Sequence, residues 1–321
     1  MNKLKLKTTA LLLLISSSAM LFGCSTKTSY GDKLNYNGAK EVSTDINLYE
    51  VSSNAKKELA KAQNLKEEPS ESQDETVTPS EDPNRAKIDF TTLSNEKQAW
   101  WFKPNKTHAT PEINLKLNYS LSDYDAHYVG DTSKPILYLT FDEGYENGYT
   151  AKILDILKEN DVKAIFFVTL PYLKDNPDLI KRMVEEGHIV GNHTNHHPSM
   201  PDVTGNEEKF NHEFSDVEDK YREITGSDIP KYFRPPMGEY SQKSLAMTKN
   251  LGYKTVFWSF AYHDWDINKQ PEPSAAKEKI LGGLHNGSIL LIHAVSKTNT
   301  EILDSVLKEA KAQGYSFELL P

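Results

Sequence analysis

Two adjacent carboxylates, Asp142 and Glu143, directly follow the apolar segment 136–141. In that position one carboxylate can act as a general base while the other binds a cation. The alternative is a turn or a helix cap ahead of Gly144, where acidic residues are common. The pair alone does not decide between catalysis and local structure.

Three histidines lie within five residues, at His193, His196 and His197. Two imidazoles four residues apart can face one metal ion, and catalytic zinc is usually held by imidazoles and a carboxylate with one position left for water. Core or surface histidines are the alternative, but three of them after a predicted strand favour a metal site. Because Cys24 is the only cysteine, such a metal must be held by histidine and carboxylate ligands.

Arg234 ends a predicted strand and begins the segment Arg-Pro-Pro-Met-Gly at residues 234–238. The two prolines restrict the backbone. The turn could therefore hold the guanidinium against a carboxylate and direct the backbone N–H of Met237 toward an oxyanion. A plain strand exit would look the same, so this turn is weak evidence by itself.

His293 follows the apolar segment 288–292, and Asp264 lies in the loop after the preceding strand. A histidine beside a carboxylate can act as a general acid, because the negative charge changes its pKa. A core histidine is the alternative. Four aromatic residues could stack on a sugar: Tyr145, Tyr149, Trp258 and Trp265. Aromatic residues more often belong to a core, which is the alternative.

The elements that must position these residues alternate between strands and helices from about Trp100 onward. Thr150 is predicted to cap the first helix, and a later helix has an apolar face made of Phe210, Phe214, Val217, Tyr221 and Ile224. Seven strands are predicted at residues 136–141, 164–169, 189–192, 232–234, 254–258, 288–292 and 316–319. This alternation predicts parallel pairing in a barrel-like or open α/β sheet.

In a parallel α/β barrel the C-terminal ends of the strands converge on one face, where the loops build the site. Asp142, His193, Arg234, Asp264 and His293 all end or follow predicted strands. Random placement of polar residues would not favour one face so consistently, and the pattern therefore predicts an enzyme.

The charge of the chain is unevenly distributed. Its 321 residues include 37 basic and 46 acidic residues, which argues against nucleic acid as the main partner because phosphate binding requires a basic surface. Residues 67–82 hold seven acidic residues, two prolines and no basic residue. Such a segment buries too little apolar surface to fold. We therefore predict a disordered acidic linker at 25–98 and a folded domain at 99–321.

The first 24 residues have the pattern of an export signal. Three lysines precede the mostly apolar segment 10–22, which is too short to span a membrane comfortably. The sequence Leu21-Phe22-Gly23-Cys24 resembles a bacterial lipoprotein box. It predicts a lipid on Cys24 and anchorage to the outer face of the cytoplasmic membrane. An ordinary signal peptide with an incidental cysteine is the alternative.

Five motifs occur in order along the chain and together resemble those of the NodB-type polysaccharide deacetylases. They are Thr140-Phe141-Asp142-Glu143-Gly144, His193-Thr194-x-x-His197-Pro198, Arg234-Pro235-Pro236-x-Gly238, His263-Asp264-Trp265 and Leu290-x-Ile292-His293. The resemblance covers about residues 134–320. It implies a distorted (β/α) barrel and metal-dependent removal of N-acetyl groups from cell-wall sugars.

Further segments look like the N-acetylmuramic acid deacetylases of spore cortex and extend the resemblance back to about residue 100. They are the sequences at residues 101–105, 144–149, 257–259 and 293–296. This subgroup implies a peptidoglycan glycan strand as the substrate, with muramic residues already stripped of their peptide by an amidase, and muramic δ-lactam as the outcome. Deacetylation of N-acetylglucosamine is the alternative.

The motifs also imply roles for individual residues. A divalent metal, expected to be Zn²⁺, would be held by His193, His197 and Glu143. The family has a second Asp where this chain has Glu143, which is one methylene longer, and His196 is a possible substitute ligand. Asp142, oriented by Arg234, would be the base.

The remaining roles concern the leaving group and the substrate. His293, polarised by Asp264, would be the acid, Met237 the oxyanion donor, and Tyr145 and Trp265 would contact the sugar. A wall-binding lipoprotein with a lapsed active site is a competing interpretation, but it would need neither base nor acid. A glycosidase is disfavoured because adjacent carboxylates rarely lie on opposite sides of a sugar bond.

Overall fold

The computed structural model describes residues 87–113 and 116–321 of the chain. The predicted export signal at 1–24, with Cys24, and most of the linker predicted at 25–98 lie outside the described residues. Within the described part, no helix is both long and apolar enough to cross a membrane.

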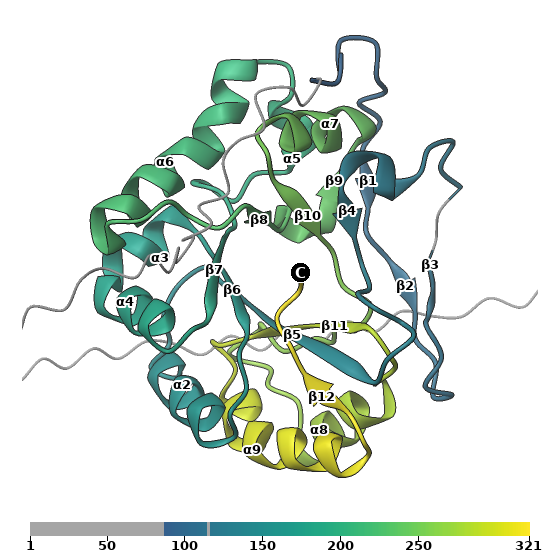
Figure 1. The fold of residues 1–321 in the computed structure, drawn as a ribbon, viewed down its shortest axis with the longest axis vertical. Coiled ribbons are helices and arrows are strands. Elements are labelled where there is room, and N and C mark those ends of the chain that lie inside the picture. Colours follow the sequence, from purple (N-terminus) through teal and green to yellow (C-terminus); the bar gives the residue numbers. More distant parts are fainter. Residues whose placement is uncertain (1–86, 114–115) are drawn as a thin grey trace, which may run out of the picture. The chain divides into compact units, whose positions relative to one another are not determined.

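A curled eight-stranded sheet forms the centre of the described domain (Figure 1). The strand order is β11-β5-β6-β7-β8-β10-β4, with β12 also paired to β5, and every ladder in this sheet is parallel. The strands are β4 (Ala126–His127), β5 (Ile136–Glu143), β6 (Ile165–Val168), β7 (Ile189–Asn192), β8 (Tyr232–Phe233), β10 (Lys254–Val256), β11 (Ser288–His293) and β12 (Ser316–Phe317). The predicted α/β barrel is therefore confirmed, and β4 is an addition to the seven predicted strands.

Helices lie outside the curled sheet (Figure 1). They are α2 (Thr150–Glu159), α3 (Leu170–Asp175), α4 (Pro177–Glu185), α5 (Met200–Val203), α6 (Glu207–Thr225), α7 (Gln242–Asn250), α8 (Pro273–Gly282) and α9 (Lys297–Ala312). The short helices α3 and α5 were not predicted. Thr150 is the first residue of α2 rather than its cap, and Tyr149 occupies the cap position.

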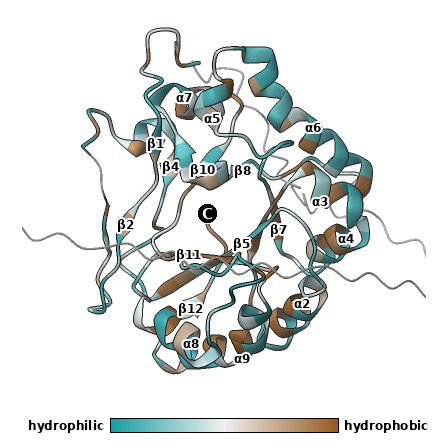
Figure 2. Cartoon of the chain, turned by 180° about the vertical axis from the view of Figure 1, so that it is seen from behind, coloured by the Kyte–Doolittle hydropathy of each residue, from teal (hydrophilic) through white to brown (hydrophobic). Residues whose placement is uncertain are grey.

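The longer helices have the local signals that begin and end a helix. The side chain of Asn206 accepts a hydrogen bond from the backbone N–H of Lys209 at the start of α6, which ends at Gly226 with a left-handed φ of 75°. Ser296 caps α9 through the N–H of Asn299. In Figure 2 much of the outer surface of α6 is hydrophilic, whereas β5 and β11 are largely hydrophobic.

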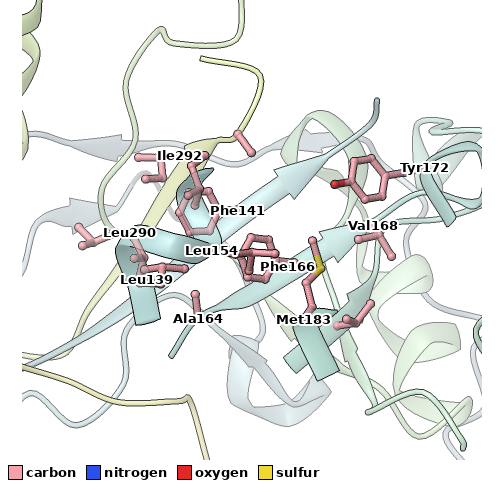
Figure 3. Close-up of a cluster of buried hydrophobic side chains, with 14 of the residues drawn as sticks. Leu139, Phe141, Leu154, Ala164, Phe166, Val168, Tyr172, Met183, Leu290 and Ile292 are labelled. Atoms are coloured by element: carbon pink, nitrogen blue, oxygen red, sulfur yellow. The ribbon is translucent and has the colours of Figure 1, made fainter. Parts of the chain in front are cut away.

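Successive residues of β5 face opposite sides of the sheet, as the pleat of a strand requires. Ile136 and Tyr138 belong to the cluster inside the barrel, together with Leu320 near the end of the chain. Leu139 and Phe141 instead pack outward in the large cluster under the helices (Figure 3). The same alternation decides where the two carboxylates at the end of β5 lie.

The residues before the barrel pack against it. Strand β1 (Gln98–Ala99) pairs with β9 (Glu239–Tyr240), and β2 (Phe102–Lys103) pairs with β3 (Glu112–Ile113), both in antiparallel fashion. Further upstream, the backbone N–H of Ile88 donates to Asn250 Oδ1 at 2.9 Å. The packed structure thus begins before the predicted boundary at residue 99.

Candidate active site

The ends of neighbouring strands bring the predicted site residues together. His293 at the end of β11 is the register partner of Asp142 near the end of β5. His193 directly follows β7 and Arg234 directly follows β8, and these two strands are paired. The convergence expected from the sequence therefore holds for the residues at the ends of four strands.

Asp142 faces the inside of the barrel and forms an ion pair with Arg234. Arg234 Nη1 donates to Asp142 Oδ1 at 2.8 Å, and to the hydroxyl of Thr140 at the same distance. Burial acts to raise the pKa of Asp142, but the neighbouring positive charges, that of Arg234 foremost, together with the hydrogen bond from Arg234 outweigh it, and the pKa lies below its ordinary value. Asp142 is thus an ionised carboxylate at neutral pH.

The Arg234 side chain is fully buried and held on several sides. Its Nε donates to the carbonyl of Val256 at 3.0 Å, and its guanidinium lies 4.3 Å from the centre of the Phe167 ring. A buried charge needs a partner and hydrogen bonds to be tolerated. These contacts fix the guanidinium, and with it the orientation of Asp142.

His193 is a buried neutral imidazole with one nitrogen left to accept. Its Nδ1 lies 2.8 Å from the carbonyl oxygen of Arg234, which can only accept, so Nδ1 donates. Burial lowers the pKa of His193 to about 4. The unprotonated Nε2 lies 3.7 Å from Asp142 Oδ2, so two electron-pair donors face each other there.

His197 is brought back toward His193 by a strained loop. Thr194 and His197 both have left-handed backbone angles, with φ of 74° and 55°. The hydroxyl of Thr194 accepts from the backbone N–H of His197 at 2.9 Å and stabilises this turn. The rings of His193 and His197 then lie 4.9 Å apart at 74°. Burial lowers the pKa of His197 as well.

His196 points away from this pair. Its Nδ1 is bonded to Glu213 Oε1 at 2.9 Å, its backbone N–H donates to the other oxygen of Glu213, and its side chain is 73% exposed. The structure therefore does not bring His196 together with His193 and His197.

Glu143 is separated from Asp142 by the alternation of β5. Its side chain is completely buried, and neither carboxyl oxygen has a hydrogen-bond partner in the described structure. Burial, followed by the negative charges of Glu146 and Asp142, raises the pKa of Glu143 well above its ordinary value. Glu143 also lies near Tyr172, whose pKa an ionised Glu143 would raise and which belongs to the outer cluster under the helices. Glu143 thus lies on the outer side of β5, where burial favours its protonated form.

The donor set fits a metal ion only in part. His193 and His197 offer two neutral imidazoles beside Asp142, which is the form that binds metals. Glu143, however, does not join them, and no group of three His, Cys, Asp or Glu side chains within residues 87–113 and 116–321 is arranged to hold a metal ion. The structure thus supplies two of the three expected ligands.

His293 and Asp264 form the second ion pair of the site. His293 Nδ1 donates to Asp264 Oδ1 at 2.7 Å, and the backbone N–H of His293 donates to Oδ2 at 2.9 Å. Burial acts to lower the pKa of His293, but the charge and the hydrogen bond of Asp264, together with the charge of Asp142, outweigh it and raise the pKa above its ordinary value. With Nδ1 engaged, Nε2 is the nitrogen that can exchange a proton with a substrate.

The remaining predicted residues lie on exposed positions. Met237, in the short turn Pro236–Gly238, has a left-handed φ of 58° and a side chain that is 56% exposed. Trp265 is half exposed, and its ring centre lies 5.8 Å from that of His293. Tyr145, in the loop after β5, is also half exposed. Their predicted contacts with substrate stay predictions.

Two residues that support the ion pairs were missed by the sequence analysis. Thr140 lies two residues before Asp142 on the inner face of β5, and a polar residue in an apolar strand at that spacing was a usable signal. Asn299 donates to Asp264 Oδ2 at 2.6 Å from the first turn of α9. No spacing rule links Asn299 to a loop thirty-five residues earlier.

Comparisons with known proteins agree with this geometry. The sequence profile of the polysaccharide deacetylases matches residues 129–256. The peptidoglycan-N-acetylmuramic acid deacetylase PdaA of Bacillus subtilis is 45% identical over 226 residues, which are 70% of this chain and 85% of that protein. A peptidoglycan-N-acetylglucosamine deacetylase of Bacillus cereus is 32% identical over 202 residues, 62% of this chain and 71% of that protein.

A solved structure shows the same fold. The structure of Bacillus subtilis PdaA, described as a family 4 carbohydrate esterase, has a TM-score of 0.68 and 44% sequence identity, covering 71% of this chain and 96% of that one. The barrel, the converging ion pairs and the extent of these matches lead to one conclusion. The chain belongs to the polysaccharide deacetylase family, the family 4 carbohydrate esterases.

Proposed function

We propose that this protein hydrolyses the N-acetyl group of N-acetylmuramic acid residues in peptidoglycan. The observation that carries the chemistry is the pair of strand-end groups with opposite charge. Arg234 favours the ionised form of Asp142, and Asp264 favours the protonated form of His293. Asp142 and His293 are register partners on adjacent strands. The higher identity to PdaA than to the N-acetylglucosamine deacetylase supports the muramic substrate.

The two ion pairs divide the proton transfers of amide hydrolysis between them. The ionised Asp142 takes a proton from the attacking water, because it is held as a base with its accepting oxygen oriented by Arg234. The protonated His293 gives a proton to the departing amine, and acetate leaves. The backbone N–H of Met237 would stabilise the oxyanion, a kind of donor worth about 10²–10³ in rate.

We also propose that His193 and His197 are protein ligands of a divalent ion, Zn²⁺ being suited to imidazole ligands. When bound, such an ion would polarise the acetyl carbonyl. The approach of His193 Nε2 to Asp142 Oδ2 at 3.7 Å, two atoms that each offer a lone pair, supports a cation at this place.

The substrate is proposed to be a muramic residue from which an amidase has already removed the peptide. Deacetylation then leaves an amine near the lactyl carboxylate of the same sugar, and proximity favours closure to muramic δ-lactam, the modification expected in spore cortex. Tyr145 and Trp265, both half exposed, would provide stacking surfaces for the sugar.

The predicted lipid on Cys24 would anchor the protein to the outer face of the cytoplasmic membrane. The acidic linker would then separate the domain from that surface and let it reach the glycan strand.

Mass spectrometry of peptidoglycan tests the proposal. The whole protein, loaded with Zn²⁺, is incubated with peptidoglycan that has or has not been treated with an amidase. Loss of acetyl groups from muramic residues, dependent on the amidase, is the expected result. Loss from glucosamine would favour the alternative substrate, new reducing ends would indicate a glycosidase, and no change would favour a lapsed active site.

A further inference from the structure

We infer that Asn299 is a positioning residue for the proton donor, acting by fixing the carboxylate of Asp264 against His293. This inference rests on the proposed function, in which His293 protonates the departing amine. Asn299 does not touch His293's ring, and its effect must pass through Asp264.

The side-chain amide of Asn299 is completely used within this cluster. Its Nδ2 donates to Asp264 Oδ2 at 2.6 Å and to the backbone carbonyl of His293 at 3.1 Å. Its Oδ1 accepts from the hydroxyl of Tyr262. Both hydrogens and the oxygen therefore have partners, and the side chain is only 1% exposed.

The orientation of this amide follows from its partners. A carboxylate and a carbonyl can only accept, so the NH₂ group must face Asp264 and the His293 carbonyl. Tyr262 reinforces this choice, because its hydroxyl donates to the oxygen. If the amide rotated by half a turn, its oxygen would face the carboxylate, and two acceptors would repel each other.

Helix α9 holds Asn299 in place. The backbone N–H of Asn299 donates to Ser296 Oγ, the helix cap, at 3.1 Å. Ser296 in turn donates to the side chain of Gln270 at 2.7 Å, and Gln270 Nε2 donates to the backbone carbonyl of Asp264 at 2.9 Å. Residues at the start of α9 are thus linked by hydrogen bonds to both the backbone carbonyl and the side chain of Asp264.

The chemical consequence concerns one oxygen of the carboxylate. Oδ2 of Asp264 accepts from Asn299 and from the backbone N–H of His293, which leaves Oδ1 for the His293 ring. Without Asn299 the carboxylate can rotate, and its contact with Nδ1 is made for a smaller fraction of the time. The His293 ring would then be protonated less readily, and its Nε2 would be oriented toward the substrate less precisely.

The test measures the titration of the His293 ring as well as the rate of acetate release. The whole protein with ¹³C-labelled histidines is titrated by NMR in the presence of Zn²⁺, and the His293 signal is assigned by its loss in His293→Gln. For Asn299→Ala we expect a lower pKa for His293, and a kcat for acetate release reduced about tenfold to a hundredfold with KM changed less than about twofold.

Tyr262→Phe provides a smaller change in the same network. It removes only the hydroxyl that orients the amide, so the same two effects are expected with smaller size. This variant also decides the matter if Asn299→Ala fails to fold.

Asn160→Ala is the matched control. Asn160 Nδ2 donates to Asp304 Oδ1 at 2.9 Å, so it is another asparagine bonded to an aspartate, here one further along α9. We expect a loss of stability from this variant and no change in the His293 titration.

The outcomes separate this inference from the proposed function. If the wild-type protein releases acetate from no peptidoglycan, the proposed function fails, while the titration still reports on Asn299. If Asn299→Ala and Tyr262→Phe fold and give the wild-type titration of His293, the inference is overturned. If Asn160→Ala shifts the titration as much as Asn299→Ala, a general effect of helix α9 replaces it.

Discussion

The inner and outer faces of β5 shift the pKa of a carboxyl group in opposite directions. Asp142 faces inward, is paired with Arg234, and has a lowered pKa. Glu143, the next residue, faces outward, has no hydrogen-bond partner among the residues that the structure describes, and has a strongly raised pKa. Burial is common to both, so the difference comes from the neighbouring charges, which are mainly the cation of Arg234 at Asp142 and the carboxylates of Glu146 and Asp142 at Glu143. Adjacency in the sequence therefore says little about shared chemistry on a strand.

The largest effect is expected when the inner carboxylate is neutralised. Asp142→Asn keeps the shape of the side chain but cannot take a proton, so acetate release should fall by about 10²–10⁴-fold. Assays of acetate release, with circular dichroism to confirm folding, check this. Asp155→Asn, which changes an exposed aspartate, is the control, and near-normal release from Asp142→Asn would remove this residue from the mechanism.

Removing the cation should make the inner face resemble the outer one. Arg234→Met leaves Asp142 buried without its partner, and a cost of about 3–5 kcal/mol in the free energy of unfolding is expected. Denaturant unfolding measures this. Arg182→Met, at partly exposed ion pairs with Asp155 and Glu186, should cost only about 0–1 kcal/mol for each pair. Equal losses of unfolding free energy for Arg234→Met and Arg182→Met would show that burial of the Arg234–Asp142 pair does not increase the cost of removing its cation.

The pH dependence of the reaction sharpens the comparison further. In the proposed mechanism, activity needs an ionised Asp142, whose pKa is lowered, and a protonated His293, whose pKa is raised. We expect a plateau that extends below the ordinary carboxyl range and above the ordinary imidazole range. In Asp264→Asn the alkaline limit of kcat should move to lower pH, since the charge that raises the pKa of His293 is gone. An unmoved limit would assign it to another group.

The smallest effect is expected on the outer face. Glu143→Gln replaces a carboxyl group whose protonated form is favoured by burial with a neutral amide of similar shape, so acetate release and bound zinc should stay within about twofold of wild type. Because the folded state raises the pKa of Glu143, wild type loses stability as the pH rises above the ordinary glutamate pKa. The variant does not titrate there, so its stability relative to wild type should increase with pH. A large loss of zinc would show that Glu143 turns inward to bind it.

The comparison also explains what the sequence could and could not predict. Strand-end convergence correctly gathers Asp142, His193, Arg234 and His293, because parallel strands end on one face. The predicted strand stops at Phe141, whereas β5 continues to Glu143. The alternation of side chains along the strand therefore extends two residues further than expected. It places Glu143 on the outer face, opposite to Asp142.

Other differences have similarly local causes. Strand β4 and helices α3 and α5 are too short to give a periodic pattern. The link from Asn299 to Asp264 depends on how the start of α9 docks on a loop, which no local pattern contains.

The closure of the barrel has one further consequence. Between the chain after β10 and strand β11 the ladder is reduced to an isolated parallel bridge between Phe260 and Leu290, whereas β5 and β11 share a long register. Asp264 and His293 stand on the two sides of this seam. We expect local opening of the barrel to begin at this seam. Hydrogen–deuterium exchange should therefore be faster at the amides of residues 259–262 than along β5. The site would then lose its proposed proton donor, His293, before it loses its proposed base, Asp142.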